Sequence, residues 1–156
     1  GRRLTARVPG PAVRGRRPPG HLLPPHLGEA AALRRTRPAR HLPDMSLHAI
    51  ALQEVGARRV LIKGGHHEEG PEAVDLLLDV DGETLLRARR VDTINTHGTG
   101  CTLSSALAAL RPQRDSWLET ALDAKSWLTA ALDAADVLEI GRGHGPVHHF
   151  HEIWDR

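Results

Sequence analysis

The sequence predicts an α/β domain, and three observations lead to that fold class. Residues 59–63 form a continuous apolar run directly after a helical pattern, which is typical of a buried strand in a parallel sheet. Residues 73–79 and 84–91 have the composition of two further strands. Residues 101–110 and 116–137 space their apolar side chains at helical intervals. We therefore expect helices packed on a sheet that is at least partly parallel.

The first predicted helix begins after Asp44, whose carboxylate is a good N-cap, and runs to about Val55. Gly56 would end it. Its expected apolar face consists of four residues, Leu47, Ile50, Ala51 and Val55.

The later elements carry clear local signals. Asp81-Gly82 between the second and third strands predicts a hairpin turn. Leu103 and Leu107 mark the apolar face of the helix over 101–110. Ser116 and Glu119 have the spacing of a capping box that opens the last helix. Its expected buried face consists of Leu118, Leu122, Leu128 and Leu132, with Trp117 and Trp127 nearby.

Charge divides the chain into two segments. Residues 1–43 hold ten Arg, eight Pro and a single acid, Glu29, whereas residues 44–156 have a net charge of −7. A basic arm for nucleic acid is one interpretation, but the segment has no aromatic side chains and no Lys. We expect a disordered leader or a corrupted, out-of-frame reading at 1–43, and a folded domain at 44–156. Because the first residue is Gly, we expect a partial chain.

The lone cysteine excludes a disulfide framework and a zinc knuckle. No uncharged apolar run approaches the roughly 18 residues that a membrane span needs. The arginine-rich start has no apolar segment of the kind found in secretory signals. These features predict a cytoplasmic protein without a membrane partner.

The most informative stretch is Asn-Thr-His-Gly-Thr-Gly-Cys-Thr at residues 95–102, between a strand and an amphipathic helix. The first N–H groups of such a helix are unpaired and lie at the positive end of its dipole. Backbone amides at Gly98, Thr99 and Gly100 would then form an anion hole, although a tight loop-to-helix turn uses the same residues. At Cys101 the dipole favours the thiolate, whereas a lone cysteine is commonly a small buried apolar residue.

Three motifs resemble those of hydroxymethylpyrimidine/phosphomethylpyrimidine kinases, which belong to the ribokinase-like superfamily. They are N-T-H-G-T-G-C-T-L-S-S-A at 95–106, V-L-I-K-G-G-H at 60–66 and G-R-G-H-G-P-V-H-H at 141–149. The first contains cysteine where related sugar kinases use aspartate. The resemblance implies an incomplete ribokinase-like three-layer α-β-α sandwich, with 44–156 as the C-terminal half of the fold.

The same resemblance implies ATP-dependent phosphorylation of 4-amino-5-hydroxymethyl-2-methylpyrimidine or its phosphate, with ATP and Mg²⁺ as cofactors. It assigns the transferred phosphoryl group to the amides of 98–101 and the role of base to Cys101. The expected nucleotide-binding residues are Lys63, Thr96 and Lys125. Solvated positions are the alternatives for Lys63, at a strand end, and Lys125, on a helix. Two further interpretations remain: a non-catalytic kinase remnant, since the pyrimidine-binding half is missing, and a pyridoxal-kinase-like enzyme.

One motif of the family is altered in this sequence. The family's Asn-x-x-Glu motif, which helps to hold magnesium, has His26 in place of Asn, so Glu29 is an indirect magnesium residue at most.

Asp75 is expected to be structural and outside the site. The tail histidines lack a Cys or a paired carboxylate to complete a metal site and are expected in a loop near the active site. The expected partners are the pyrimidine and ATP, and no nucleic acid. We also expect a homo-oligomer.

Overall fold

The computed structural model describes residues 22–23, 37–64 and 70–154. The described strands are β1 (Leu22–Leu23), β2 (Arg59–Ile62), β3 (Glu72–Asp79) and β4 (Gly82–Arg89). The described α-helices are α2 (Leu42–Glu54), α3 (Thr99–Leu110) and α4 (Trp117–Asp133), with short 3-10 helices at Arg111–Gln113 and Ala135–Leu138. None of the helices in this part of the chain is long and apolar enough to cross a membrane.

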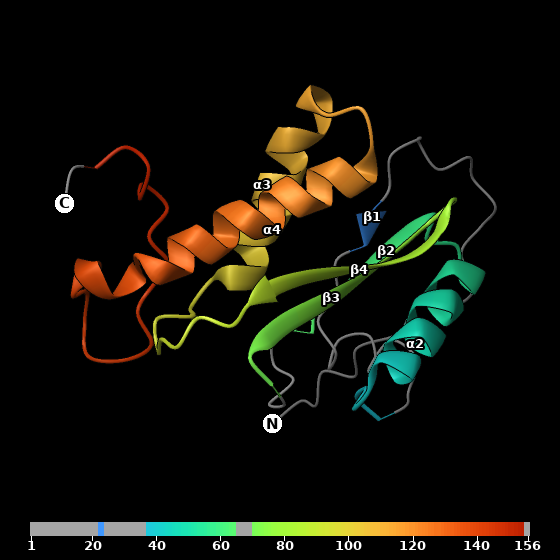
Figure 1. Cartoon of the computed structure of the whole chain (residues 1–156), viewed down its shortest axis with the longest axis horizontal. Helices are drawn as coiled ribbons and strands as arrows, with labels where there is room; N and C mark the ends of the chain where they lie inside the picture. Colours follow the sequence, from blue (N-terminus) through green and yellow to red (C-terminus); the bar gives the residue numbers. More distant parts are fainter. Residues whose placement is uncertain (1–21, 24–36, 65–69, 155–156) are drawn as a thin grey trace, which may run out of the picture.

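The strands form one sheet in the order β1-β2-β3-β4 (Figure 1). Only β1 and β2 are parallel, whereas β2–β3 and β3–β4 are antiparallel. The expected partly parallel sheet is therefore found at β1–β2, and the predicted hairpin makes β3 and β4 antiparallel, whereas the antiparallel pairing of β2 with β3 was not expected. The physical reason is connection length, because a parallel crossover needs about a dozen residues or more. Two residues separate β3 from β4, and only residues 63–71 separate β2 from β3.

Helices cover both faces of the sheet, which confirms the α/β class and the partial three-layer sandwich (Figure 1). Adjacent residues of β2 point in opposite directions, as in any strand. Ile62 packs in a core with Met45 and Leu52 of α2. Leu61 packs in a second core whose helical members come from α3 and α4: Leu103, Leu107, Ala121 and Ala124.

Helix α2 begins earlier than its sequence suggests. Its N-cap is His41, and Pro43 lies in the first turn, where proline's fixed φ and missing N–H fit well. Asp44 is thus not the N-cap but a first-turn residue, and its Oδ2 accepts the Arg40 N–H at 3.0 Å. This hydrogen bond lowers the pKa of the Asp44 carboxyl.

Two predicted buried faces are also corrected. Leu47 and Ile50 of α2 and its C-cap residue Val55 are exposed, and the core side is formed by Met45, Ala49, Ala51 and Leu52. In α4, Leu118 and Leu122 are exposed, and small residues face the core together with Thr120 and Lys125. Leu128 of the predicted face does pack against the core, and the small Ala121 and Ala124 let α4 lie close to α3 and to the sheet.

Local signals gave correct predictions. The β3–β4 hairpin closes with Asp79 opposite Gly82, and α2 ends before Gly56 at φ 105°. Ser116 and Glu119 form the capping box of α4, with the Glu119 N–H donating to Ser116 Oγ at 3.0 Å. Leu103 and Leu107 are buried as expected.

Candidate functional site

The loop from β4 leads directly into the open start of α3. Gly98 is the N-cap with φ 82°, a left-handed conformation that glycine adopts without steric cost. The Thr102 N–H donates to the Gly98 carbonyl at 2.8 Å and so closes the first helical turn. The N–H groups of Gly100 and Cys101 come before this first helical hydrogen bond in the chain, so no carbonyl group of the helix accepts them. They form a site that suits an anion.

Lys63, at the end of β2, brings a cation to this helix start. A Cβ added at Gly100 would lie 2.8 Å from Lys63 Nζ, so the ammonium occupies the space that glycine leaves free. An ammonium and the positive end of a helix dipole repel each other when nothing lies between them. An anion held by both removes that repulsion, which favours binding of a phosphate at this point.

A cavity of about 240 Å³ lies beside Lys63. Its lining includes four residues predicted from the sequence as site residues, Lys63, Thr96, Thr99 and Lys125. Leu103, Leu128 and Leu132 supply an apolar wall from α3 and α4. The cavity therefore combines cationic groups with an apolar surface, a combination that suits a ligand with a charged end and an apolar end.

Lys125 is buried, so the alternative of a solvated helix position is wrong. Its Nζ donates to Asp75 Oδ2 at 2.7 Å, and Asp75 Oδ1 accepts the Gly64 N–H at 2.9 Å. Asp75 lines the same cavity, so its exclusion from the site does not fit the geometry. A carboxylate within the apolar run at 73–78 was the available signal, because a buried charge needs a partner.

The two glycines after Lys63 belong to the family-like motif, and Gly64 has a clear steric role. A Cβ at this position would lie 2.1 Å from the Val74 carbonyl oxygen of β3. No side chain fits there without moving one of the two strands. Gly64 therefore lets β2 and β3 approach closely at the point where Lys63 leaves the sheet.

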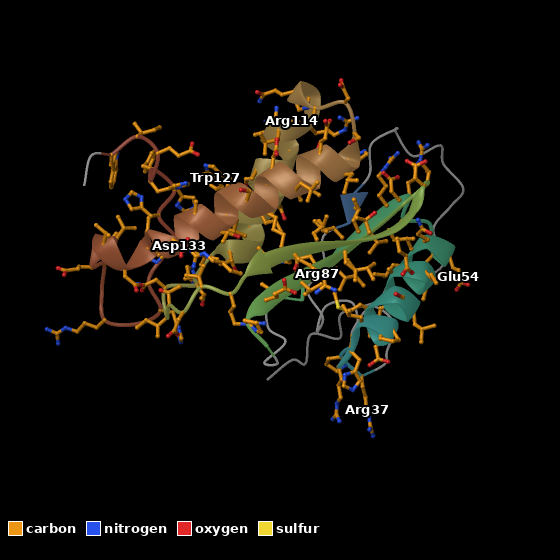
Figure 2. The ribbon with its side chains drawn as sticks, in the orientation of Figure 1. Arg37, Glu54, Arg87, Arg114, Trp127 and Asp133 are labelled. Carbon is orange, nitrogen blue, oxygen red and sulfur yellow. The ribbon has the colours of Figure 1, made fainter. Side chains whose placement is uncertain are left out.

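Cys101 lies on a different side of the helix start. Its side chain is exposed and lines a second groove, of about 800 Å³, between α3 and α4. Trp127 of α4, labelled in Figure 2, and Arg114, in the α3–α4 connection, also line this groove. The structure thus brings Lys63, Thr96, Thr99 and Lys125 into one cavity and places Cys101 in the neighbouring groove.

The C-terminal motif packs onto the glycine loop. The Gly145 N–H donates to Asn95 Oδ1 at 3.0 Å, and the His97 N–H donates to the Gly145 carbonyl at 3.1 Å. His149 Nε2 and Thr102 Oγ1 form a hydrogen bond of 2.9 Å. The segments that carry the three sequence motifs therefore converge around the start of α3.

The family model for phosphomethylpyrimidine kinase matches residues 17–148. This chain belongs to the phosphomethylpyrimidine kinase family. The match includes residues 17–43, and Leu22–Leu23 within them pair with β2. A leader over 1–43 stays a prediction, because most of that segment lies outside the described residues.

A curated relative in this kinase family is the hydroxymethylpyrimidine/phosphomethylpyrimidine kinase of Salmonella typhimurium. It is 53% identical over 133 residues, which are 85% of this chain and 50% of that protein. The chain thus spans about half the length of the curated relatives it matches.

Solved structures of kinases confirm the ribokinase-like fold. Bacillus subtilis pyridoxal kinase in an ADP complex is 30% identical, with a TM-score of 0.78 over 86% of this chain and 50% of that chain. Staphylococcus aureus pyridoxal kinase with AMP-PCP and pyridoxal is 26% identical, with a TM-score of 0.78 over 85% of this chain and 49% of that chain.

The kinase family implies a magnesium ion, and the described residues include few candidate ligands for it. Glu29, the predicted magnesium residue, lies outside them. Within residues 22–23, 37–64 and 70–154, no three His, Cys, Asp or Glu side chains are grouped as metal ligands.

Proposed function

We propose that this chain supplies the phosphate-binding and nucleotide-binding part of an ATP-dependent kinase. The acceptor is 4-amino-5-hydroxymethyl-2-methylpyrimidine or its phosphate, in thiamine biosynthesis. The observation that carries the proposal is the Lys63 ammonium beside the open start of α3, at the edge of the cavity that Thr96 and Lys125 also line. Phosphoryl transfer needs such positioning and charge stabilisation more than covalent chemistry.

The phosphate groups of the nucleotide have two sources of stabilisation in this arrangement. The backbone amides of Gly98, Gly100 and Cys101 lie at the helix start and would hold the γ-phosphoryl group, and the Thr99 N–H, which donates to the Thr96 carbonyl at 3.4 Å, would join them only by leaving that bond. Lys63 would neutralise part of the phosphoryl group's charge from the other side. The backbone amides are held in place by α3 before the substrate binds, so they need little reorganisation in the transition state.

Cys101 is the proposed base. It would take the proton from the hydroxymethyl oxygen while that oxygen forms a bond to the γ-phosphorus and the bond to the β-phosphate oxygen breaks. ADP and the phosphate ester are the products. Cys101 follows Gly100 in the first turn of α3 and faces the groove rather than the cavity. An acceptor in the groove would thus meet a nucleotide in the cavity at the helix start.

Pyridoxal phosphorylation is a second candidate, because the two similar solved structures are pyridoxal kinases. The higher identity to the Salmonella enzyme and the cysteine in the glycine loop favour the pyrimidine. A non-catalytic remnant is the third candidate, because the chain spans half of its relatives' length.

The test is ADP formation from ATP by this 156-residue chain, with the pyrimidine, its phosphate and pyridoxal as separate acceptors. We expect turnover with the pyrimidines and a loss of about a hundredfold or more in Cys101→Ala, the contribution typical of a general base. Full turnover in Cys101→Ala would contradict the base assignment. Faster turnover with pyridoxal would favour the second candidate, and nucleotide binding without turnover would favour the third.

The remaining parts of the proposal rest on the family resemblance and on chemistry. Mg²⁺ would enter with the triphosphate, since it binds through phosphates and one or two carboxylates, and Glu29 is the candidate carboxylate. The absence of any cysteine pair is usual for proteins of reducing compartments, which supports a cytoplasmic location. A homo-oligomer is proposed as the assembly, with no nucleic acid or membrane as partner.

A further inference from the structure

Asp75 connects the two cationic sides of the cavity. Its side chain is buried on β3, and each of its two oxygens binds a different element. Oδ1 accepts the Gly64 N–H at 2.9 Å, at the end of β2, and Oδ2 accepts the Lys125 ammonium at 2.7 Å, from the middle of α4.

Both partners of Asp75 are tied to the proposed nucleotide site. Gly64 is the residue next to Lys63, so the hydrogen bond at Gly64 fixes the backbone from which the Lys63 side chain extends. Lys125 lines the cavity directly. One carboxylate therefore binds the ammonium of Lys125 and the backbone next to Lys63, and these two residues are the only lysines in the sequence.

Stability alone is a weak explanation for this pair. Removing two charges from water costs about as much as their attraction returns, and an apolar pair of similar size is often at least as stable. Apolar side chains, Leu103 and Leu128 among them, already line this region. A charged pair in such surroundings is better explained by what it does at the cavity.

We propose that Asp75 is a positioning residue of the nucleotide site. It holds the Lys125 ammonium and the Lys63–Gly64 strand end so that both cations meet the phosphates of a bound nucleoside diphosphate or triphosphate. The inference rests on the proposed function, because it assigns the cavity to a nucleotide.

Asp79 provides a matched control on the same strand. It forms an ion pair with Arg59 at 2.6 Å and is largely buried, as Asp75 is. Asp79 is not among the residues that line the cavity. Asp79→Asn therefore removes a similar charge from the same face of β3 without touching the lysines.

The first measurement is ADP affinity of the full chain by calorimetry, for Asp75→Asn, Lys125→Met and the double variant. Asparagine still accepts the Gly64 N–H but no longer holds the ammonium, so Asp75→Asn isolates the Lys125 interaction. We expect about tenfold weaker binding in Asp75→Asn, equivalent to one charge-assisted contact. In the Lys125→Met background and in Asp79→Asn, we expect changes of no more than about twofold. An equal loss in both backgrounds would overturn the proposal, because a merely structural role predicts it.

The second measurement needs no nucleotide. A short pulse of acetic anhydride followed by mass spectrometry reports the reactivity of each lysine, with Lys63 as the internal reference. We expect Asp75→Asn to raise the labelling of Lys125 relative to Lys63 severalfold, and Asp79→Asn to leave the ratio unchanged. An unchanged ratio in Asp75→Asn would overturn the positioning role. Absence of ADP binding by the wild-type chain would instead contradict the proposed function and leave the labelling result to decide on Asp75.

Asp75→Glu is the second variant in case Asp75→Asn does not fold. It keeps the charge but moves the carboxylate by one methylene group. We expect weaker ADP binding and an altered labelling ratio in a folded chain. Wild-type values for both quantities would overturn the proposal.

Discussion

At the scale of single residues, the site depends on glycines, which leave space for neighbouring groups, as much as on charged side chains. Gly100 leaves the space that the Lys63 ammonium occupies, and Gly145 approaches Asn95 so closely that a Cβ would lie 2.3 Å from its Oδ1. Both contacts join segments that are distant in the sequence. The motif glycines are therefore needed for these approaches, and not only for flexible turns.

Gly100→Ala separates stability from binding. Alanine is favoured over glycine within a helix by about 1 kcal/mol, so we expect the melting temperature to stay level or rise. The added Cβ would push Lys63 Nζ from its place, and we expect nucleotide affinity to fall by about tenfold, the value of one charge-assisted contact. Calorimetric titration with ADP and thermal unfolding measure the two effects.

Gly143→Ala is the matched control for Gly100→Ala, because an added Cβ meets no atom within 4 Å at that position. It is expected to change neither quantity. Unaltered ADP affinity in Gly100→Ala would show that the position of Lys63 does not matter for binding.

Asp75 illustrates what sequence reasoning misses at this scale. The apolar run around it predicts burial, and burial of a carboxylate implies a partner. The partner, Lys125, lies 50 residues further along the chain, and no local pattern connects the two. The glycine loop was predictable because glycines at an open helix start are a local signal for an anion site, and Lys63 because its motif resembles that of the kinases.

At the scale of helices and strands, the sequence was informative wherever the determinants are local. The capping box of α4 and the β3–β4 hairpin each depend on residues within a few positions of one another. Strand direction depends on how distant segments pair, so the antiparallel β2–β3 arrangement was not predicted. The buried face of α2 was misassigned because its apolar residues lie on both sides of the helix, and the sheet decides which side is covered.

Ser116→Ala tests how much the capping box contributes. It removes the oxygen that accepts the Glu119 N–H, and we expect a loss of about 1 kcal/mol in the free energy of unfolding. Urea unfolding followed by circular dichroism measures the change. Ser126→Ala, at an exposed position within α4, is the control and is expected to have little effect. Equal stability of the two variants would mean that packing alone fixes the start of α4.

At the scale of the whole molecule, one thin sheet separates two hydrophobic cores. Val60 and Ile62 face α2, while Leu61 between them faces α3 and α4. Two ion pairs also connect α4 to the sheet. Lys125 pairs with Asp75 of β3, and Asp133, labelled in Figure 2, pairs with Arg89 of β4. Because both cores share β2 and β3, neither can lose its packing without disturbing strands that the other requires.

This shared sheet predicts a single cooperative unfolding transition. Leu61→Ala and Ile62→Ala each remove a buried side chain from one of the two cores, and each is expected to lower the free energy of unfolding by about 2–5 kcal/mol, as truncation of a buried aliphatic side chain does.

Leu85→Ala, on the exposed side of β4, is the matched control and should cost less than about 1 kcal/mol. Urea unfolding is followed by tryptophan fluorescence, which reports on Trp117 and Trp127 of α4 and on Trp154 near the end of the chain, and by far-ultraviolet circular dichroism, which reports on all helices. Coincident transitions that shift together in both core variants are expected, since the layers unfold as one unit. Separate transitions, with Ile62→Ala affecting only the circular dichroism signal, would show that the α2 layer unfolds independently of the layer that holds the nucleotide cavity.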